Sequence, residues 1–177
     1  MKKIDIIVIF LFAVTMVILI YNFKYKKKHN ILVIGDTYLK DLNIINCSSV
    51  NCDFLYNRKK YIDIIDDIRK NKYIYKKSSK VYLNKKINQS STIIISANNE
   101  EYKTKCTKND RIIKEYDYKL YTQILSLIKT INKISSAKVV IVGNACINNN
   151  ETKKLYKNIN YININEVYYN KKTLDFD

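Results

Sequence analysis

The chain has 177 residues and a formal net charge of +16, with 32 lysines and arginines against 16 aspartates and glutamates. It has no Pro, no Trp and only two Gly, and its lysines are spread along the whole length. A nucleic-acid site would need a compact basic patch with interleaved aromatic residues, so the charge does not indicate nucleic-acid binding. A solvated basic surface that also favours anionic lipid headgroups explains it better.

The first predicted element is a membrane anchor. Residues 6–23 read IIVIFLFAVTMVILIYNF and carry no charge, and about 18 apolar residues are enough to span a hydrocarbon core. Tyr21 and Phe23 stand where interfacial aromatic residues belong, and four of residues 24–28 are lysines. We therefore expect residues 1–29 to form a single-pass anchor that contacts membrane lipid through residues 6–23.

Two questions about this segment are whether it is cleaved as a secretory signal and which way it is oriented in the membrane. A cleaved secretory signal would need a small-residue cleavage site, and no A-x-A pattern follows the apolar run. The orientation stays open on charge alone. The lysines after residue 23 favour a cytoplasmic domain by the positive-inside rule, whereas a signal-anchor with a short basic start favours the opposite.

Residues 30–177 have the length of one domain. Its first predicted strand is the apolar run 31–34, which Gly35 and Asp36 close. Residues 61–70 have apolar side chains at helical spacing. The next predicted strand, residues 92–96, is again a continuous β-branched run. Runs of this kind are typical of parallel strands buried on both faces.

The second half of the domain repeats this alternation. Residues 109–134 are the longest amphipathic segment and predict a helix, and residues 151–156 predict a short one. Residues 138–144 predict a buried strand, whereas residues 161–165 alternate in polarity and suit an edge strand with one polar face. The apolar stripe of the long helix comprises Ile112, Tyr116, Leu120, Ile124, Leu127, Ile128 and Ile131. Strands alternating with helices predict an α/β three-layer sandwich with a mostly parallel, flavodoxin-like sheet.

The four cysteines do not form a metal-binding pattern, because no C-x-x-C is present and His29 is the only histidine. Cys47 and Cys52 are close enough to form a disulfide if the domain lies outside the cytoplasm, and buried free thiols are the alternative. No nucleotide-binding glycine motif follows any predicted strand. We therefore expect no metal and no cofactor.

Polar residues follow three of the predicted strands. They form the segments Gly35-Asp36-Thr37, Ala97-Asn98-Asn99-Glu100 and Gly143-Asn144. In an open parallel sheet, ligands bind at the carboxyl ends of the strands, so these segments are candidates for a shared site. The simpler explanation is that Gly, Asp and Asn form good turns.

The first strand with Gly35-Asp36-Thr37 resembles the opening Gly-Asp-Ser block of the SGNH (GDSL-type) hydrolases. Residues 92–100, TIIISANNE, resemble the third block of that family. The resemblance covers residue 31 to the C-terminus and includes Tyr56-Asn57 and the later strands. It implies an SGNH-like fold and ester hydrolysis or acyl transfer, with Thr37 at the nucleophile position and Asn99 at the oxyanion-hole position.

The chain retains Gly35, Asp36 and Asn99 of the family pattern but departs from it at the nucleophile, at the third-block glycine and at the histidine. Thr37 stands in place of the serine and is more crowded, because its side chain is β-branched. Ala97 replaces the third-block glycine. Asp175 or Asp177 could correspond to the aspartate of the family's Asp-x-x-His block, but the chain ends before the histidine. His29 precedes the first strand and would lie about 20 Å from Thr37, so it cannot act as its base.

We therefore expect a membrane-anchored SGNH-like protein that is catalytically degenerate or truncated. The first alternative is an active envelope esterase or acyltransferase that uses Thr37, Asp36 and Asn99 on an acylated envelope glycan or another small ester. The second is a non-enzymatic basic module at the membrane surface. Because anchored members of the family act on envelope material, the resemblance favours an extracytoplasmic domain.

Overall fold

The computed structural model describes residues 12, 14–17, 30–35, 47, 50–56, 60–76, 79–97, 110–143 and 150–164. Of the predicted anchor helix, only Phe12 and residues 14–17 are among them, and these residues are helical with exposed side chains. Within the described residues, no helix combines the length and the apolarity that a membrane crossing requires.

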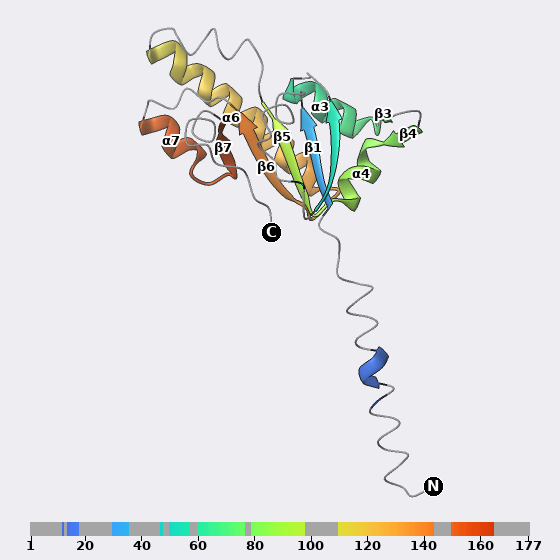
Figure 1. Cartoon of the computed structure of the whole chain (residues 1–177). Coiled ribbons are helices and arrows are strands. Elements are labelled where there is room, and N and C mark those ends of the chain that lie inside the picture. The colour runs from blue at the N-terminus through green and yellow to red at the C-terminus, as the bar shows by residue number, and fades with distance from the viewer. Residues whose placement is uncertain are drawn as a thin grey trace, which may run out of the picture.

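A parallel sheet forms the centre of the domain (Figure 1). In the described part of the chain it has five strands, in the order β2-β1-β5-β6-β7, and every neighbouring pair is parallel. Numbered along the chain, this order is 2-1-3-4-5, one of the two common orders of doubly wound α/β folds. The strands are β1 (Asn30–Gly35), β2 (Asn51–Tyr56), β5 (Thr92–Ser96), β6 (Lys138–Gly143) and β7 (Tyr161–Asn163).

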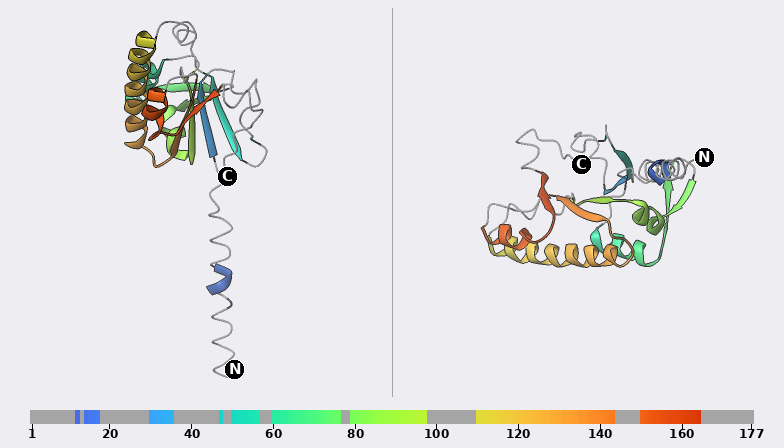
Figure 2. Two further views of the ribbon diagram at one scale, coloured as in Figure 1. Left: turned by 90° about the vertical axis from the view of Figure 1, so that its left-hand side faces the viewer. Right: turned by 90° about the horizontal axis from the view of Figure 1, so that it is seen from below.

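The helices that follow β2 pack on one face of the sheet, as the view from below shows (Figure 2). They are α3 (Tyr61–Arg69), α4 (Leu83–Gln89), α6 (Asp110–Asn132) and α7 (Asn150–Tyr156). A small antiparallel hairpin, β3 (Tyr73–Lys76) and β4 (Ser79–Tyr82), joins α3 to α4. A shared face is expected, because β2 to β5, β5 to β6 and β6 to β7 all step in the same direction and such crossovers are right-handed.

Successive side chains of the strands fill two cores, one on each face of the sheet. On the helix side, Ile93 and Ile95 of β5 pack with Ile124 and Leu127 of α6, and all four side chains are inaccessible to solvent. On the other face Ile94 belongs to a second buried cluster, against which Cys47 and Val50 of the β1–β2 connection pack. Since both faces are buried, the prediction of doubly buried parallel strands is confirmed.

The predicted α/β class is confirmed, and the four predicted strands and three predicted helices are present with ends that differ by at most two residues. Two details are wrong. Asn163 of the edge strand β7 is buried rather than exposed on a polar face, and Ile112 of the α6 stripe is 39% exposed, because it lies in the first turn of the helix. The sequence reasoning missed β2, β3, β4 and α4.

Candidate functional site

The carboxyl edge of the sheet contains a topological switch point between β1 and β5. The chain leaves β1 toward β2 on one side and leaves β5 toward β6 on the other. Ligands of doubly wound folds bind in the crevice that such a reversal creates. The strands end there in Gly35 and Ser96, which lie side by side because Ile34 is paired with Ile95 in the preceding register position.

Both glycines of the chain stand at this edge, and each meets the end of β5. A Cβ atom on Gly35 would overlap the Cβ atom of Ser96. A Cβ atom on Gly143 would lie 2.6 Å from that of Ala97 and 3.3 Å from the hydroxyl of Tyr161. The Ala97 backbone N–H donates to the carbonyl of Val142 over 2.8 Å, which draws the end of β5 against β6. The two glycines therefore make room for Ser96 and Ala97.

The sequence-predicted site residues themselves lie outside the described residues. They are Asp36, Thr37, Asn99, Asp175, Asp177 and the excluded His29. The structure places the residues that come just before two of the predicted groups. Gly35 directly precedes Asp36, and Ala97 precedes Asn99 by two positions. Gly35 and Ala97 are buried at the same edge of the sheet, Gly35 as the last residue of β1 and Ala97 directly after β5.

A second polar cluster, which the sequence reasoning missed, is buried between α6 and α7. The Asp117 side chain is inaccessible to solvent and accepts a 2.9 Å hydrogen bond from the Thr152 hydroxyl through Oδ2. The Tyr156 hydroxyl donates to the backbone carbonyl of Asp117 over 3.4 Å. The Tyr156 ring stacks on Tyr161, with centroids 4.2 Å apart, and Tyr161 reaches Gly143. The cluster thereby connects the helix layer to the carboxyl edge.

Burial raises the pKa of two tyrosines in and beside this cluster. Desolvation, followed by the nearby Asp117 carboxylate and then Tyr121, raises the pKa of Tyr156 well above its ordinary value. Desolvation, followed by the proximity of Tyr156, likewise raises the pKa of Tyr61 at the start of α3. Both phenols therefore stay protonated at neutral pH and act as neutral groups. The sequence contains one indication of this cluster. Asp117 precedes Leu120 by three positions, so a carboxylate lies within the apolar face of the helix.

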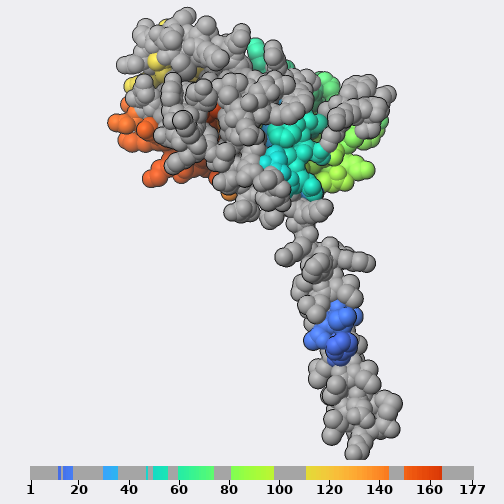
Figure 3. Space-filling view, in the orientation of Figure 1, coloured from blue at the N-terminus to red at the C-terminus, as the bar shows by residue number. Residues whose placement is uncertain are grey.

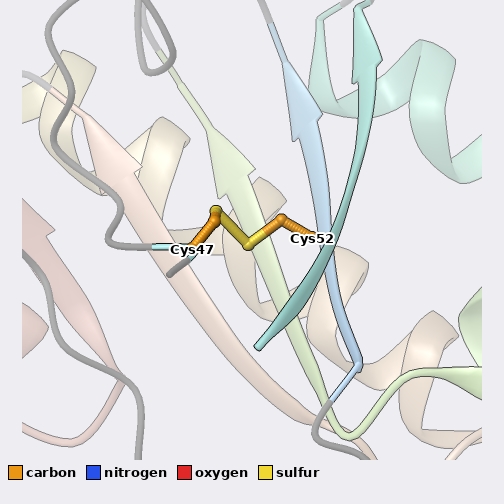
Figure 4. The surroundings of a disulfide bond; sticks show 2 residues. All are labelled: Cys47 and Cys52. Atoms are coloured by element: carbon orange, nitrogen blue, oxygen red, sulfur yellow. A yellow bond between two sulfur atoms is a disulfide. The ribbon is translucent and has the colours of Figure 1, made fainter. Parts of the chain in front are cut away.

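Cys47 and Cys52 form a disulfide (Figure 4), which settles the choice that the sequence left open. The bond joins the connection between β1 and β2 to the second residue of β2. Both half-cystines are partly buried and pack against the cluster of Ile31, Val33 and Ile94. The disulfide therefore holds part of the β1–β2 connection against the face of the sheet opposite the helices.

No known family model matches this chain, and none of the curated proteins matches it either. Within the described residues, no group of three or more His, Cys, Asp or Glu side chains could hold a metal ion.

Proposed function

We propose that the protein is a membrane-anchored domain with an SGNH-like three-layer fold whose ligand site lies at the β1/β5 switch point and whose catalytic machinery has degenerated. The observation that carries the proposal is the 2-1-3-4-5 strand order, which makes β1 and β5 neighbours and so brings together the ends of the two strands that precede the motif segments. Asp36 and Thr37 directly follow the end of β1, and Asn98 and Asn99 follow the buried end of β5.

The fit between Ala97 and Gly143 supports a degenerate copy of the fold. Where the resemblance expects a glycine at the end of the third strand of the sheet, this chain has Ala97, and the added methyl group occupies the space that a side chain at position 143 would need. A chain that has lost the motif glycine would need this free space at position 143. The replacement of the nucleophilic serine by Thr37 points in the same direction.

The proposed ligand is an acylated envelope glycan or another small ester. The Asn99 amide would donate a hydrogen bond to the acyl carbonyl, and Thr37 would supply a hydroxyl beside it. Because Thr37 is a β-branched alcohol with a stiffer χ1 than the serine of the family pattern, its hydroxyl would be a poor nucleophile. The domain would therefore bind the ester and leave it intact.

An extracytoplasmic location fits the Cys47–Cys52 disulfide. Disulfides persist in oxidising compartments and are rare in the cytoplasm, where thiols are kept reduced. The positive-inside rule gives the opposite orientation for the lysines after residue 23. Alkylation of intact cells with a membrane-impermeant maleimide, with and without a reductant, tests the orientation. Labelling of Cys47 and Cys52 only after reduction is the expected result.

The catalytic part of the proposal is tested with the full chain in nanodiscs and p-nitrophenyl acetate as an activated ester. We expect the wild type, Thr37→Ala and Thr122→Ala to hydrolyse the ester at the same background rate. Thr122 is a matched control because it is exposed on α6, away from the carboxyl edge. Turnover that Thr37→Ala abolishes and Thr122→Ala retains would identify an active esterase. In that enzyme, Asn99→Ala should lower the rate by about 10²-fold or more, as the loss of an oxyanion donor does.

The binding part is tested by calorimetric titration with an O-acetylated oligosaccharide and with the same oligosaccharide after de-O-acetylation. We expect binding of the acetylated form only, weakened at least about tenfold by Asn99→Ala. Asn88→Ala, which changes an exposed asparagine of α4, serves as the control and should bind like the wild type. Equal affinity of the wild type and Asn99→Ala would remove the proposed site.

A further inference from the structure

The amino ends of the strands form a second pole of the domain, opposite the carboxyl edge (Figure 1). Asn30 and Asn51 are paired at the starts of β1 and β2. The Ser91 backbone N–H donates to the Asn30 carbonyl, and the Lys138 N–H donates to the Ser91 carbonyl, each over 2.9 Å. These hydrogen bonds set the starts of β1, β2, β5 and β6 at one level, and we call this end of the domain the amino pole.

Two open hollows lie at the amino pole, and amide, hydroxyl and ammonium groups contribute to the lining of both. The first, of about 540 Å³, includes Asn132, Ser136, Lys138 and Asn160. The second, of about 580 Å³, includes Asn30, Asn51, Gln89 and Lys86. Figure 3 shows β2 and α4, which border the second hollow, side by side on the surface. Both hollows therefore present hydrogen-bond donors to solvent.

The charge around the hollows is positive. Lys85 of α4, Lys133 after α6 and Lys138 at the start of β6 are exposed. Among the described residues that line the hollows, Asp53 is the only acidic one, and its Oδ2 lies 2.6 Å from Lys86 Nζ. The other described carboxylates with described side chains lie on α3, α6 and α7, where Asp67 pairs with Lys72 and Glu151 with Lys114. The lysines of the amino pole thus make a local excess of positive charge.

Chain connectivity places this pole nearest the membrane if residues 6–23 span it. Asn30, the first residue of β1, follows Phe23 by seven positions, which reach at most about 25 Å when fully extended. The opposite ends of the strands lie about 20 Å farther away, since β1 has six residues at about 3.3 Å each. The amino pole is therefore the part of the domain that the tether brings within range of lipid headgroups.

We propose that the amino pole is a docking surface for the phosphate groups of anionic phospholipids in the membrane that holds the anchor. The exposed lysines attract the negative surface. The Ser90 and Ser135 hydroxyls already donate to backbone carbonyls. The donors to phosphate oxygens are therefore the Ser136 hydroxyl and the second amide N–H of asparagines such as Asn30 and Asn160, whose first N–H is used inside the domain. Docking turns the carboxyl edge away from the bilayer, toward ligands that are not membrane lipids. This inference rests on the anchor in the proposed function, and it is independent of the site at Asn99.

Hydrogen exchange on the full chain, reconstituted in vesicles, tests the docking. One set of vesicles contains phosphatidylcholine alone, and the other contains 30% phosphatidylglycerol. We expect the amides of residues 133–138 to exchange at least threefold more slowly in the anionic vesicles. The protection should disappear in 0.5 M NaCl, where the Debye length falls to about 4 Å, and in the triple variant Lys85→Gln, Lys133→Gln, Lys138→Gln.

The matched control variant is Lys60→Gln, Lys119→Gln, Lys153→Gln, which removes the same charge from exposed positions before α3, on α6 and on α7. It should keep the protection. Equal exchange in both vesicles by a chain that resists alkaline carbonate extraction overturns the docking and leaves the anchor intact. Extraction of the chain by carbonate overturns the anchor, and the docking proposal falls with it.

Discussion

Gly143 and Ala97 share one space at the carboxyl edge of the sheet, since a Cβ atom on Gly143 would lie 2.6 Å from the Cβ atom of Ala97. The two residues belong to different segments, 46 positions apart in sequence, and the pairing of β5 with β6 brings them together. Only one of the two positions can carry a side chain without a shift of the strands. Their side-chain volumes are therefore coupled.

Gly143→Ala should lower the free energy of unfolding by about 1–3 kcal/mol, the usual cost of overpacking a filled core. Ala97→Gly in the same chain should restore at least about 1 kcal/mol, because it removes the colliding methyl group. Urea unfolding of the wild type, both single variants and the double variant measures this coupling. Ala137→Gly is the control, since Ala137 is buried to the same extent as Ala97 and precedes β6 at the opposite end of the strand. Additive effects of Gly143→Ala and Ala97→Gly would contradict the prediction.

Thr152→Val should destabilise the protein by about 1–3 kcal/mol, because it removes a hydrogen bond from the buried Asp117 carboxylate while keeping the shape of the side chain. The loss should be visible in chemical unfolding at neutral pH. Thr122→Val, at an exposed position of α6, provides the comparison and should change the stability by no more than about 0.5 kcal/mol. Equal effects of the two substitutions would mean that the Asp117–Thr152 bond contributes nothing.

Tyr61→Phe should raise the free energy of unfolding by about 1 kcal/mol at neutral pH. The Tyr61 hydroxyl is buried and has no hydrogen-bond partner among the described residues, and such a group costs about 1–3 kcal/mol in desolvation. Tyr118→Phe, at a largely exposed position of α6, is the control and should be close to neutral. A destabilised Tyr61→Phe variant would show that the hydroxyl is satisfied.

The same variant should change the alkaline limb of the stability curve. Because burial raises the pKa of Tyr61 in the folded state, the unfolded chain loses this proton first as the pH rises past about 10. The folded state is therefore favoured fully below that pH and progressively less above it, by about 1.4 kcal/mol per pH unit for one group. Between pH 8 and pH 11, Tyr61→Phe should lose less stability than the wild type. Parallel curves for the two proteins would contradict this.

Replacing both Cys47 and Cys52 by Ala should lower the free energy of unfolding by about 2 kcal/mol. The bond closes a short loop, with a sequence separation of five residues, so its entropic effect on the unfolded chain is modest. Reduction of the wild type should have a similar effect and should not affect the double variant. A change in the double variant on reduction would show that part of the effect arises elsewhere.

The long periodic elements could be predicted from the sequence because the residues within each element are enough to indicate whether it is a strand or a helix. The β-branched runs of β1, β5 and β6 are too apolar to face water, and the residues of α6 repeat with helical spacing. β2 was not predicted, because its residues NCDFLY mix polarity. Asp53 is partly exposed on this edge strand, where Lys86 of α4 reaches it. The ion pair joins residues 33 positions apart, so the sequence around Asp53 does not indicate it.

The sequence by itself determined the α/β class and the order of four strands and three helices, because side-chain periodicity is set within each segment. It also supplied the motif resemblance and the apolar N-terminal run. Only the tertiary structure decided which strands are neighbours, and hence that Gly35 and Ala97 stand at the carboxyl ends of the two strands of the switch point. The tertiary structure also determined that Cys47 and Cys52 form a disulfide, that Asp117 is buried, and that Gly143 lies against Ala97. The physical reason is that each of these depends on sheet pairing or helix packing between segments whose separation in sequence carries no information about their distance in space.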